Sequence, residues 1–187
     1  DALHGDPTRF VTRSVANHLN DLSRIMPERV LARLGAWRVA GRQEARELDW
    51  MTRHALRTAV KRGERGALDF LGYRAGAVAA SLSVTPGSPS IGDRIGIVAD
   101  LQSVERLPVM VDYRIVFARP NRQGEKVFKL KTAVLQPGKT LRLEKRHHLK
   151  GDATTFRLYP GPHRVVLQVN GQDVAEAGFD LLDEAVG

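Results

Sequence analysis

The 187-residue sequence contains no cysteine, few aromatic residues and no long apolar segment. The absence of cysteine excludes disulfides and thiolate metal sites, and it fits a reducing compartment. Since no run of about 18 apolar residues is present, the sequence predicts no membrane-spanning helix, and no signal peptide is visible. Because the chain begins at Asp1 without Met, we expect a processed chain or a fragment of a longer protein.

Common catalytic signatures are also absent: the sequence has no GxSxG, Walker A, GxGxxG or HExxH motif. His147 and His148 are adjacent, but neighbouring strand residues point to opposite faces, and no carboxylate is placed to complete a metal shell. We therefore expect no metal site and no cofactor. For the two histidines we expect contact with phosphate or plain exposure.

Positive charge is what the sequence has in excess, with a net charge of +8 and a pI of about 10.3. This balance favours an anionic partner, with nucleic acid first and an acidic membrane surface second. Residues 119–150 contain ten Lys and Arg against Glu125 and Glu144, so this basic window alone carries 10 − 2 = +8. The concentration suggests a docking surface, and the alternative is a solvated strand face.

The first part of the chain, residues 1–75, shows the spacing of amphipathic helices. Pro at a first helical position, Asp as an N-cap and Gly as a stop mark the expected boundaries. The four predicted helices begin at Pro7, Pro27, Asp49 and about Ala67, and the first three end near Leu22, Gly41 and Gly63.

An internal repeat relates these helices. Residues 12–15 (TRSV) match residues 52–55 (TRHA) at an offset of 40, which is typical of HEAT-like helical repeats. Because stacked neighbours supply the core of such arrays, two repeats are few, and we expect further repeats to precede Asp1.

Two polar clusters on these helices are candidate contact sites. Arg53, Arg57 and Lys61 recur at i, i+4 and form a basic row along roughly 12 Å of one predicted helix. Since like charges at this spacing repel, the row requires solvent or an anionic partner. Asn17 and His18 lie near Arg13 on the first helix, either in a groove that binds phosphates or in a buried network between repeats.

Trp37 and Trp50 are the two tryptophans of the chain. We expect both to pack within the helical repeats and not to form a platform for stacking on bases.

The second part, residues 77–187, alternates polar and apolar residues between turns rich in Gly and Pro. Asn170-Gly171 between two such runs predicts a hairpin. About seven strands predict an immunoglobulin-like sandwich, so the fold class is α + β in two domains. On the strand at 109–117, alternation puts Val111, Tyr113, Ile115 and Phe117 on one face. On the strand at 126–134, alternation predicts Phe128 and Leu130 inward, with Lys129 and Lys131 outward.

Taken together, these residues resemble the C-terminal part of the bacterial DNA alkylation repair proteins of the AlkC type. The resemblance covers nearly the whole chain. It is carried by residues 13–21, 50–58, 111–115 and 126–131, and by 159–163 running on to 169–171.

The resemblance implies a HEAT-like-repeat DNA glycosylase with an immunoglobulin-like C-terminal domain. Such enzymes excise cationic N-alkylated bases such as 3-methyladenine, without the usual extrusion of the base. The helical array would form a concave basic cleft, and the β domain would grip the DNA from the far side. The family's catalytic carboxylates sit on repeats that would precede Asp1, so none is assigned in this sequence.

We therefore predict a DNA-binding role in base-excision repair of alkylated DNA. The expected partner is double-stranded DNA, without membrane attachment or an obligate protein partner, for a cytoplasmic, nucleoid-associated monomer. The alternative is a non-catalytic helical-repeat scaffold that binds an acidic protein, and a third, weaker one is attachment to anionic lipid. The predicted DNA-binding residues are Arg13, Asn17, His18, Arg53, Arg57, Lys61, Lys129, Lys131, Lys145 and Arg146.

Overall fold

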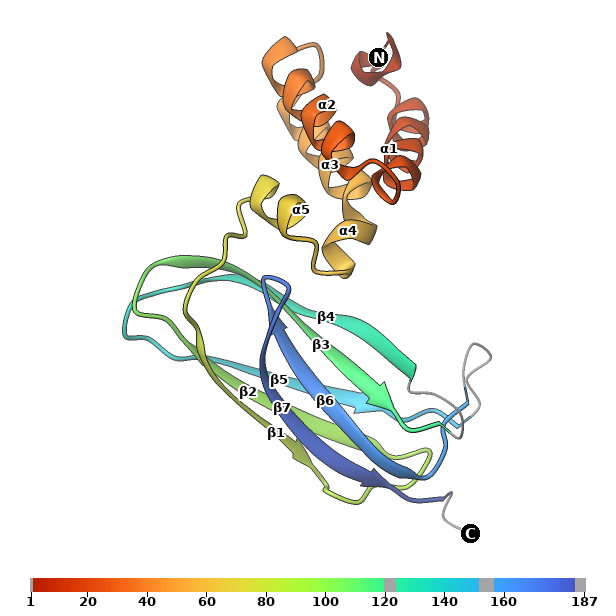
Figure 1. The fold of residues 1–187 in the computed structure, drawn as a ribbon, viewed down its shortest axis with the longest axis vertical. Coiled ribbons are helices and arrows are strands. Elements are labelled where there is room, and N and C mark those ends of the chain that lie inside the picture. Colours follow the sequence, from red (N-terminus) through yellow and green to blue (C-terminus); the bar gives the residue numbers. More distant parts are fainter. Residues whose placement is uncertain (1, 120–123, 152–156, 184–187) are drawn as a thin grey trace. The chain divides into compact units, whose positions relative to one another are not determined.

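The computed structural model describes residues 2–119, 124–151 and 157–183. The chain divides into two compact units, Asp1–Arg74 and Ala75–Gly187. Across the described residues, the first unit holds five α-helices and a short 3-10 helix, and the second holds seven β-strands (Figure 1). This order confirms the predicted fold class of helices followed by a β-sandwich.

The helical unit has three longer helices followed by two short ones. Its elements are η1 (Ala2–Gly5), α1 (Arg9–Ser23), α2 (Pro27–Ala40), α3 (Ala45–Ala55), α4 (Arg57–Lys61) and α5 (Arg65–Phe70). Pro27 at the start of α2 and left-handed Gly41 at its end confirm the predicted second helix. In the first helix the predicted start at Pro7 is wrong. Asp6 Oδ1 accepts from the Thr8 amide at 2.8 Å, so a turn occupies this position and α1 begins at Arg9.

The predicted continuous helix from Asp49 to Gly63 is also wrong, because it is broken at Leu56 into α3 and α4. The carboxamide oxygen of Asn20, from α1, accepts the Thr58 amide hydrogen at 3.2 Å. The carbonyl of His54, which that amide would bond in a continuous helix, accepts from Arg57 at 2.6 Å. A side chain inserted into the backbone ladder is a known cause of a kink.

Apolar side chains from all five helices form the core of this unit. Leu34, Met51 and Ala55 are fully buried, and Leu56 at the kink is 1% exposed. Trp37 is also buried, and its ring stacks on His4 with 4.6 Å between centroids. The expectation that the tryptophans pack within the repeats is confirmed for Trp37, and Trp50 is partly buried against the same core.

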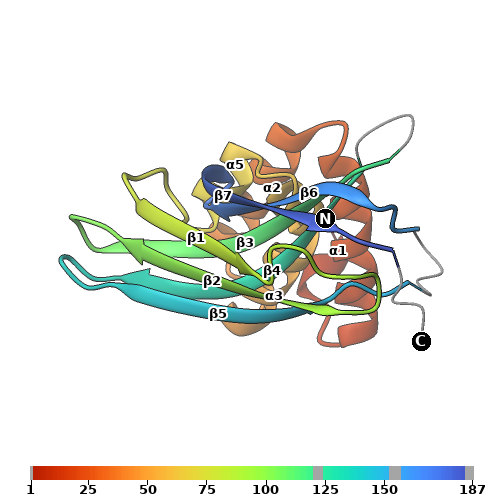
Figure 2. The same ribbon diagram turned by 90° about the horizontal axis from the view of Figure 1, so that it is seen from below.

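The β unit is a sandwich of two antiparallel sheets with strand orders β1-β2-β5 and β4-β3-β6-β7 (Figure 2). The order places β5 and β4 at the edges of their sheets. The strands are β1 (Ala79–Thr85), β2 (Arg94–Gln102), β3 (Leu107–Phe117), β4 (Gly124–Leu135), β5 (Leu141–His148), β6 (Gly161–Val169) and β7 (Gln172–Leu181).

Alternating side chains of the central strands fill the space between the sheets. On β3 the predicted inward residues Tyr113, Ile115 and Phe117 are at most 2% exposed. The predicted hairpin is confirmed: Asn170 and Gly171 both have positive φ, and they join β6 to β7. Asn170 also fixes this turn to β3, since its carboxamide accepts from the Met110 amide at 2.8 Å.

Among the helices of the described residues, none is long and apolar enough to cross a membrane.

Candidate nucleic-acid interface

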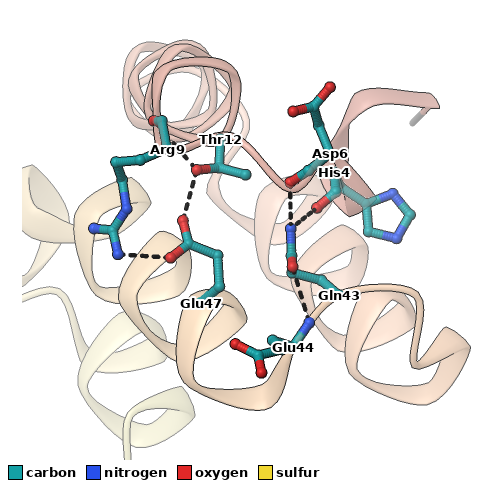
Figure 3. A network of polar contacts seen from close by, with 7 residues as sticks. All are labelled: His4, Asp6, Arg9, Thr12, Gln43, Glu44 and Glu47. Atoms are coloured by element: carbon teal, nitrogen blue, oxygen red, sulfur yellow. Dashed lines mark hydrogen bonds and ion pairs between the residues drawn. The ribbon is translucent and has the colours of Figure 1, made fainter.

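A polar network fastens the start of α1 to α3 (Figure 3). Glu47 accepts from the Arg9 guanidinium and from the Thr12 hydroxyl, both at 2.6 Å. Gln43 donates to the carbonyl oxygens of His4 and Asp6, each at 2.9 Å. One carboxylate and one amide from the region of α3 therefore hold both η1 and α1 in place.

The guanidinium of Arg9 has a second contact on α3. It lies 3.8 Å from the ring centroid of Trp50, and Trp50 stacks on His54 with 4.9 Å between centroids. The cation–π and ion-pair contacts together fix Arg9 in one orientation. Trp50 is thus engaged by neighbours of its own unit, as expected for a packing residue.

Asn17 binds two side chains next to this stack, His54 and Arg57. Its Oδ1 accepts from Nε2 of His54 at 2.8 Å and from the Arg57 guanidinium at 3.2 Å. Burial, followed by the charges of Arg57, Arg13 and Arg9, lowers the pKa of His54. This geometry matches the network interpretation of Asn17, in which the residue ties α1 to α3 and α4. Asn20, buried one turn further along, makes the same kind of tie at Thr58.

The basic row does not form the straight line that the sequence predicted, because Arg53 is on α3 while Arg57 and Lys61 are on α4. Arg53 donates to Asp49 at 2.9 Å, and this hydrogen bond is the main cause that raises the pKa of Arg53. Asp49 therefore lies within α3 as the partner of Arg53, whereas Glu44 occupies the N-cap position. Lys61 is exposed.

His18 is exposed at the border of a pocket of about 520 Å³ between η1, α1 and α2. Arg33 and Trp37 line the same pocket, which otherwise has mainly apolar walls. Arg13 is exposed on α1. Contacts of Arg13, Asn17 and His18 with phosphate stay predictions.

The basic window maps onto β4 and β5, which follow each other in the chain and are edge strands of opposite sheets. The rings of Phe128 on β4 and His147 on β5 meet with 4.7 Å between centroids. We call the open side of the sandwich between β4 and β5 the seam. The high charge density of residues 119–150 is therefore gathered along one side of the β unit.

A bulge in β4 separates its two candidate lysines. The register between β3 and β4 shifts between Val111 and Asp112, so Lys129 pairs with Asp112 whereas Lys131 pairs with buried Val111. Because directly opposed residues share a face, Lys129 lies on the outer face and Lys131 starts from the inner face. Both lysine side chains are exposed and Leu130 packs against the core, as predicted. The alternation did not predict that Lys131 pairs with Val111.

The two candidate cations on β5 also lie on different faces. Lys145 pairs with Ile97, which is 1% exposed, whereas Arg146 pairs with Gly96 on the outer face. Lys145 thus shares the inner face with Leu143 and His147. The alternation of Leu141, Leu143 and Lys145 in the sequence already carried this signal.

Lys126 was not among the predicted contact residues, yet it pairs with buried Ile115 and so belongs to the inner face. The sequence contained a signal for this, because Lys126 lies two residues before Phe128 and alternation places both on the same face of the strand. Inner-face positions of the two edge strands therefore carry three lysines: Lys126, Lys131 and Lys145.

Three aromatic rings form the floor of the seam. Tyr113 stacks on Phe128 with 5.1 Å between centroids, and its hydroxyl lies 2.9 Å from Nδ1 of His147. Burial first, and then the charges of Lys145, His148 and Lys126, lower the pKa of His147 to about 4. Burial raises the pKa of Tyr113 to about 12.

The expectation of plain exposure is wrong for His147, which is partly buried against Tyr113 and Phe128, whereas contact with phosphate stays a prediction. His148 is exposed, and its Nε2 lies 2.9 Å from the Gly92 carbonyl.

Acidic partners are distributed unevenly over the β unit. Arg142 pairs with Asp100 at 3.1 Å and with Glu144 at 3.2 Å. Arg114 pairs with Asp173 at 2.6 Å and with Glu125 at 3.4 Å. Neither arginine was a predicted contact residue. Within the described ranges, no acidic group forms an ion pair with the four predicted cations of the β unit, Lys129, Lys131, Lys145 and Arg146. These cations are directed to solvent.

Among the described residues, no group of three or more His, Cys, Asp or Glu is arranged to hold a metal ion. The side chains gathered along the seam are amines and aromatic rings, a set that suits an extended anion better than a cation.

Comparison with known proteins places this arrangement in context. Residues 78–183 match the family described as "Uncharacterised protein YhaZ, C-terminal Ig-like domain". The chain is 29% identical over 175 residues to the uncharacterized protein YhaZ of Bacillus subtilis (strain 168), covering 92% of this chain and 48% of that protein.

A solved structure also matches nearly the whole chain. It is the Pseudomonas fluorescens alkylpurine DNA glycosylase AlkC bound to DNA containing an abasic site analog. The TM-score is 0.88 at 36% identity, covering 97% of this chain and 51% of that one. The chain thus spans about half the length of both relatives.

Proposed function

The chain belongs to the family of the YhaZ C-terminal Ig-like domain, and from this premise we propose that it is the DNA-binding C-terminal part of a DNA alkylation repair glycosylase. The observation that carries the proposal is the likeness to an alkylpurine DNA glycosylase bound to DNA, at 36% identity over 97% of this chain. The basic side of the β-sandwich supplies a matching chemistry, since amines without acidic partners favour a polyanion.

The reaction we propose is hydrolysis of the N-glycosidic bond of a cationic N-alkylated base such as 3-methyladenine. The positive charge on such a base makes it a good leaving group, so the protein must mainly stabilise charge at the sugar and position a water molecule. We assign no catalytic residue in this chain. Among the carboxylates that form ion pairs within the described residues, Glu47 is the most buried, with 17% of its side chain exposed. It is already bonded to Arg9 and Thr12.

The role we propose for these residues is to bind the duplex and complete the cleft. Exposed Arg13, His18 and Lys61 are the predicted contacts of the helical unit, and the cations of β4 and β5 those of the β unit. Arg53, Arg57 and Asn17 have internal partners that fix their orientation. Phosphate contacts of this kind are independent of base sequence, which suits an enzyme that must act at any position.

Binding of the 187-residue chain to a fluorescent duplex, measured across about 50 to 200 mM salt, tests the proposal. We expect affinity to fall steeply with salt, because each phosphate contact releases counterions. A flat salt dependence contradicts DNA binding. Capture of an acidic protein without retention of DNA would instead support the scaffold alternative.

A chimera tests the enzymatic part of the proposal. These residues would replace the matching half of the Pseudomonas fluorescens enzyme, and release of alkylated bases from methylated DNA would be measured. We expect the chimera to retain base release, with circular dichroism confirming that it is folded. A folded chimera that binds DNA but releases no base would contradict the assignment to glycosylase chemistry.

A further inference from the structure

We propose that the seam between β4 and β5 is the phosphate-binding site of the β unit, with Lys131 and Lys145 as its direct contacts. Lys129 and Arg146, their neighbours on the same two strands, face outward and are not part of this site. The inference rests on the proposed function, because the phosphates are those of a DNA strand. It adds a specific site and divides cations that the sequence alone grouped together.

The positions of the two lysines are the first argument. Each is opposite a fully enclosed residue of the neighbouring strand, since Lys131 pairs with Val111 and Lys145 with Ile97. Inner-face positions normally carry apolar residues that enlarge the core. A lysine there gives up that contribution and reaches solvent only by extending its alkyl chain out through the open side.

The bulge in β4 is the second argument. Strict alternation would leave Lys131 on the outer face with Lys129, as the sequence pattern predicted. The register shift adds one residue, Leu130, and turns Lys131 to the inner face. Bulges on edge strands commonly redirect a side chain in this way. The two edge strands therefore bring Lys131 and Lys145 to the same opening from opposite sheets.

The surroundings of the seam are the third argument. The rings of Tyr113, Phe128 and His147 give the seam an apolar floor, and an amine beside such a surface attracts an anion more strongly than one surrounded by water. The low pKa of His147 keeps this ring uncharged near neutral pH, so the ring adds no repulsion between the lysines. Lys126, on the inner face beside Phe128, extends the positive surface along β4.

Protection of the sheet edges is the alternative explanation. Inward-pointing charges and bulges on edge strands also prevent two sheets from joining edge to edge. That explanation predicts that removing the lysines changes self-association and leaves DNA affinity unchanged. The two explanations therefore differ in a measurable quantity.

The experiment compares two double variants that remove the same charge from the same strands. Lys131→Gln with Lys145→Gln alters the seam, and Lys129→Gln with Arg146→Gln is the matched outer-face control. Affinity of the 187-residue chain for a labelled duplex would be measured by fluorescence anisotropy between about 50 and 200 mM salt. We expect the seam variant to lose about tenfold in affinity and the slope of log K against log salt to flatten by about 2. The control should lose less than about threefold.

Equal losses in the two variants would overturn the proposal, because only net charge would then matter. Unchanged DNA binding with new self-association in sedimentation would overturn it in favour of edge protection. A Lys131→Arg, Lys145→Arg variant should restore at least half of the lost slope if the loss comes from charge and not from misfolding. If the seam proposal alone fails, the unaltered chain still binds DNA, whereas a chain that binds no DNA refutes the proposed function as well.

Discussion

The cations of the helical unit and those of the β unit are held in different ways. In the helical unit, Arg9 pairs with Glu47, Arg53 pairs with Asp49, and Arg57 is hydrogen bonded to Asn17. In the β unit, the described residues place no acidic partner on Lys131 or Lys145. Cations that look alike in the sequence therefore differ in whether they have a partner in the structure.

This difference assigns separate tasks to the two sets. The guanidinium groups of Arg9 and Arg57 bond to residues of another helix and so hold helices together, whereas Arg53 pairs with Asp49 within α3. In each case the existing partner reduces the attraction to a phosphate. An amine directed to solvent without a partner adds little to folding, and it releases counterions when a phosphate binds. The comparison predicts that variants of the partnered polar residues in the helical unit mainly change stability, whereas variants in the seam mainly change binding.

The largest effect on stability is expected from Asn20→Ala. Asn20 is 1% exposed and accepts the Thr58 amide hydrogen at the start of α4. Its loss leaves a partly buried donor without a partner and opens a small cavity, so unfolding by urea should cost about 2 kcal/mol less. Ser14→Ala, at an exposed hydroxyl on the same helix, is the control and should change stability by less than about 0.5 kcal/mol. Equal values for the two variants would contradict the structural role of the helical polar groups.

The next effect concerns pH and His147. Burial lowers its pKa to about 4 in the folded chain from the ordinary value of 6.5, so the folded state disfavours the charged ring. As pH falls from about 6.5 to 4, the unfolded state binds a proton that the folded state does not, and stability is lost. Because the ring is partly exposed, we expect a loss of about 1 kcal/mol after discounting for solvent.

The measurement for His147 is the unfolding free energy between about pH 7 and 4 for the unaltered chain and for His147→Gln. Burial also lowers the pKa values of His54 and His163, so their contributions have the same sign and remain in both proteins. The difference between the two curves isolates His147. A difference that does not change with pH would contradict the neutral ring in the floor of the seam.

A smaller effect is expected when Arg53→Ala and Arg57→Ala are combined. Both side chains have partners within the helical unit, so we expect duplex affinity to fall by about two- to threefold and equally for all DNA sequences. Anisotropy with several unrelated duplexes checks this. A loss that depends on sequence would indicate contact with base edges.

The smallest effect is expected from Arg142→Gln, within the basic window but paired with Asp100 and Glu144. Removing this charge also frees two carboxylates, yet the side chain is exposed and lies on the outer face of β5. We expect duplex affinity to change by less than about twofold and stability by less than about 0.5 kcal/mol. A loss as large as that of the seam variant would show that the pairing of cations does not decide their role.

Regular features of the fold followed from the sequence because they depend on neighbours in the chain. Alternation on β3 identified Tyr113 and Ile115 as core residues, and Asn170-Gly171 identified the hairpin. Pro27 and Gly41 marked both ends of α2. These signals act within a few residues, so no tertiary contact was needed to interpret them.

The features that the sequence did not predict depend on contacts between distant residues. The kink at Leu56 is made by Asn20, which is 38 residues before the Thr58 amide that it binds. The orientation of Lys131 depends on a register shift against β3, which the alternation of β4 alone does not encode. His147 was expected at the surface because its role depends on Tyr113 and Phe128 from the other sheet. The sequence therefore identified most residues of the candidate site, whereas the structure was needed to show which of them lie on the same face.

The most direct test compares three proteins in one salt titration: the unaltered chain, the Lys131→Gln, Lys145→Gln variant, and the Arg53→Ala, Arg57→Ala variant. Each variant removes two positive charges, so a difference between them reports position and not net charge. We predict that the slope of log K against log salt flattens by about 2 for the seam variant and by less than 1 for the helical variant. The reverse order, or equal slopes, would contradict the claim that the unpaired lysines of the seam bind DNA more strongly than Arg53 and Arg57, which have partners within the helical unit.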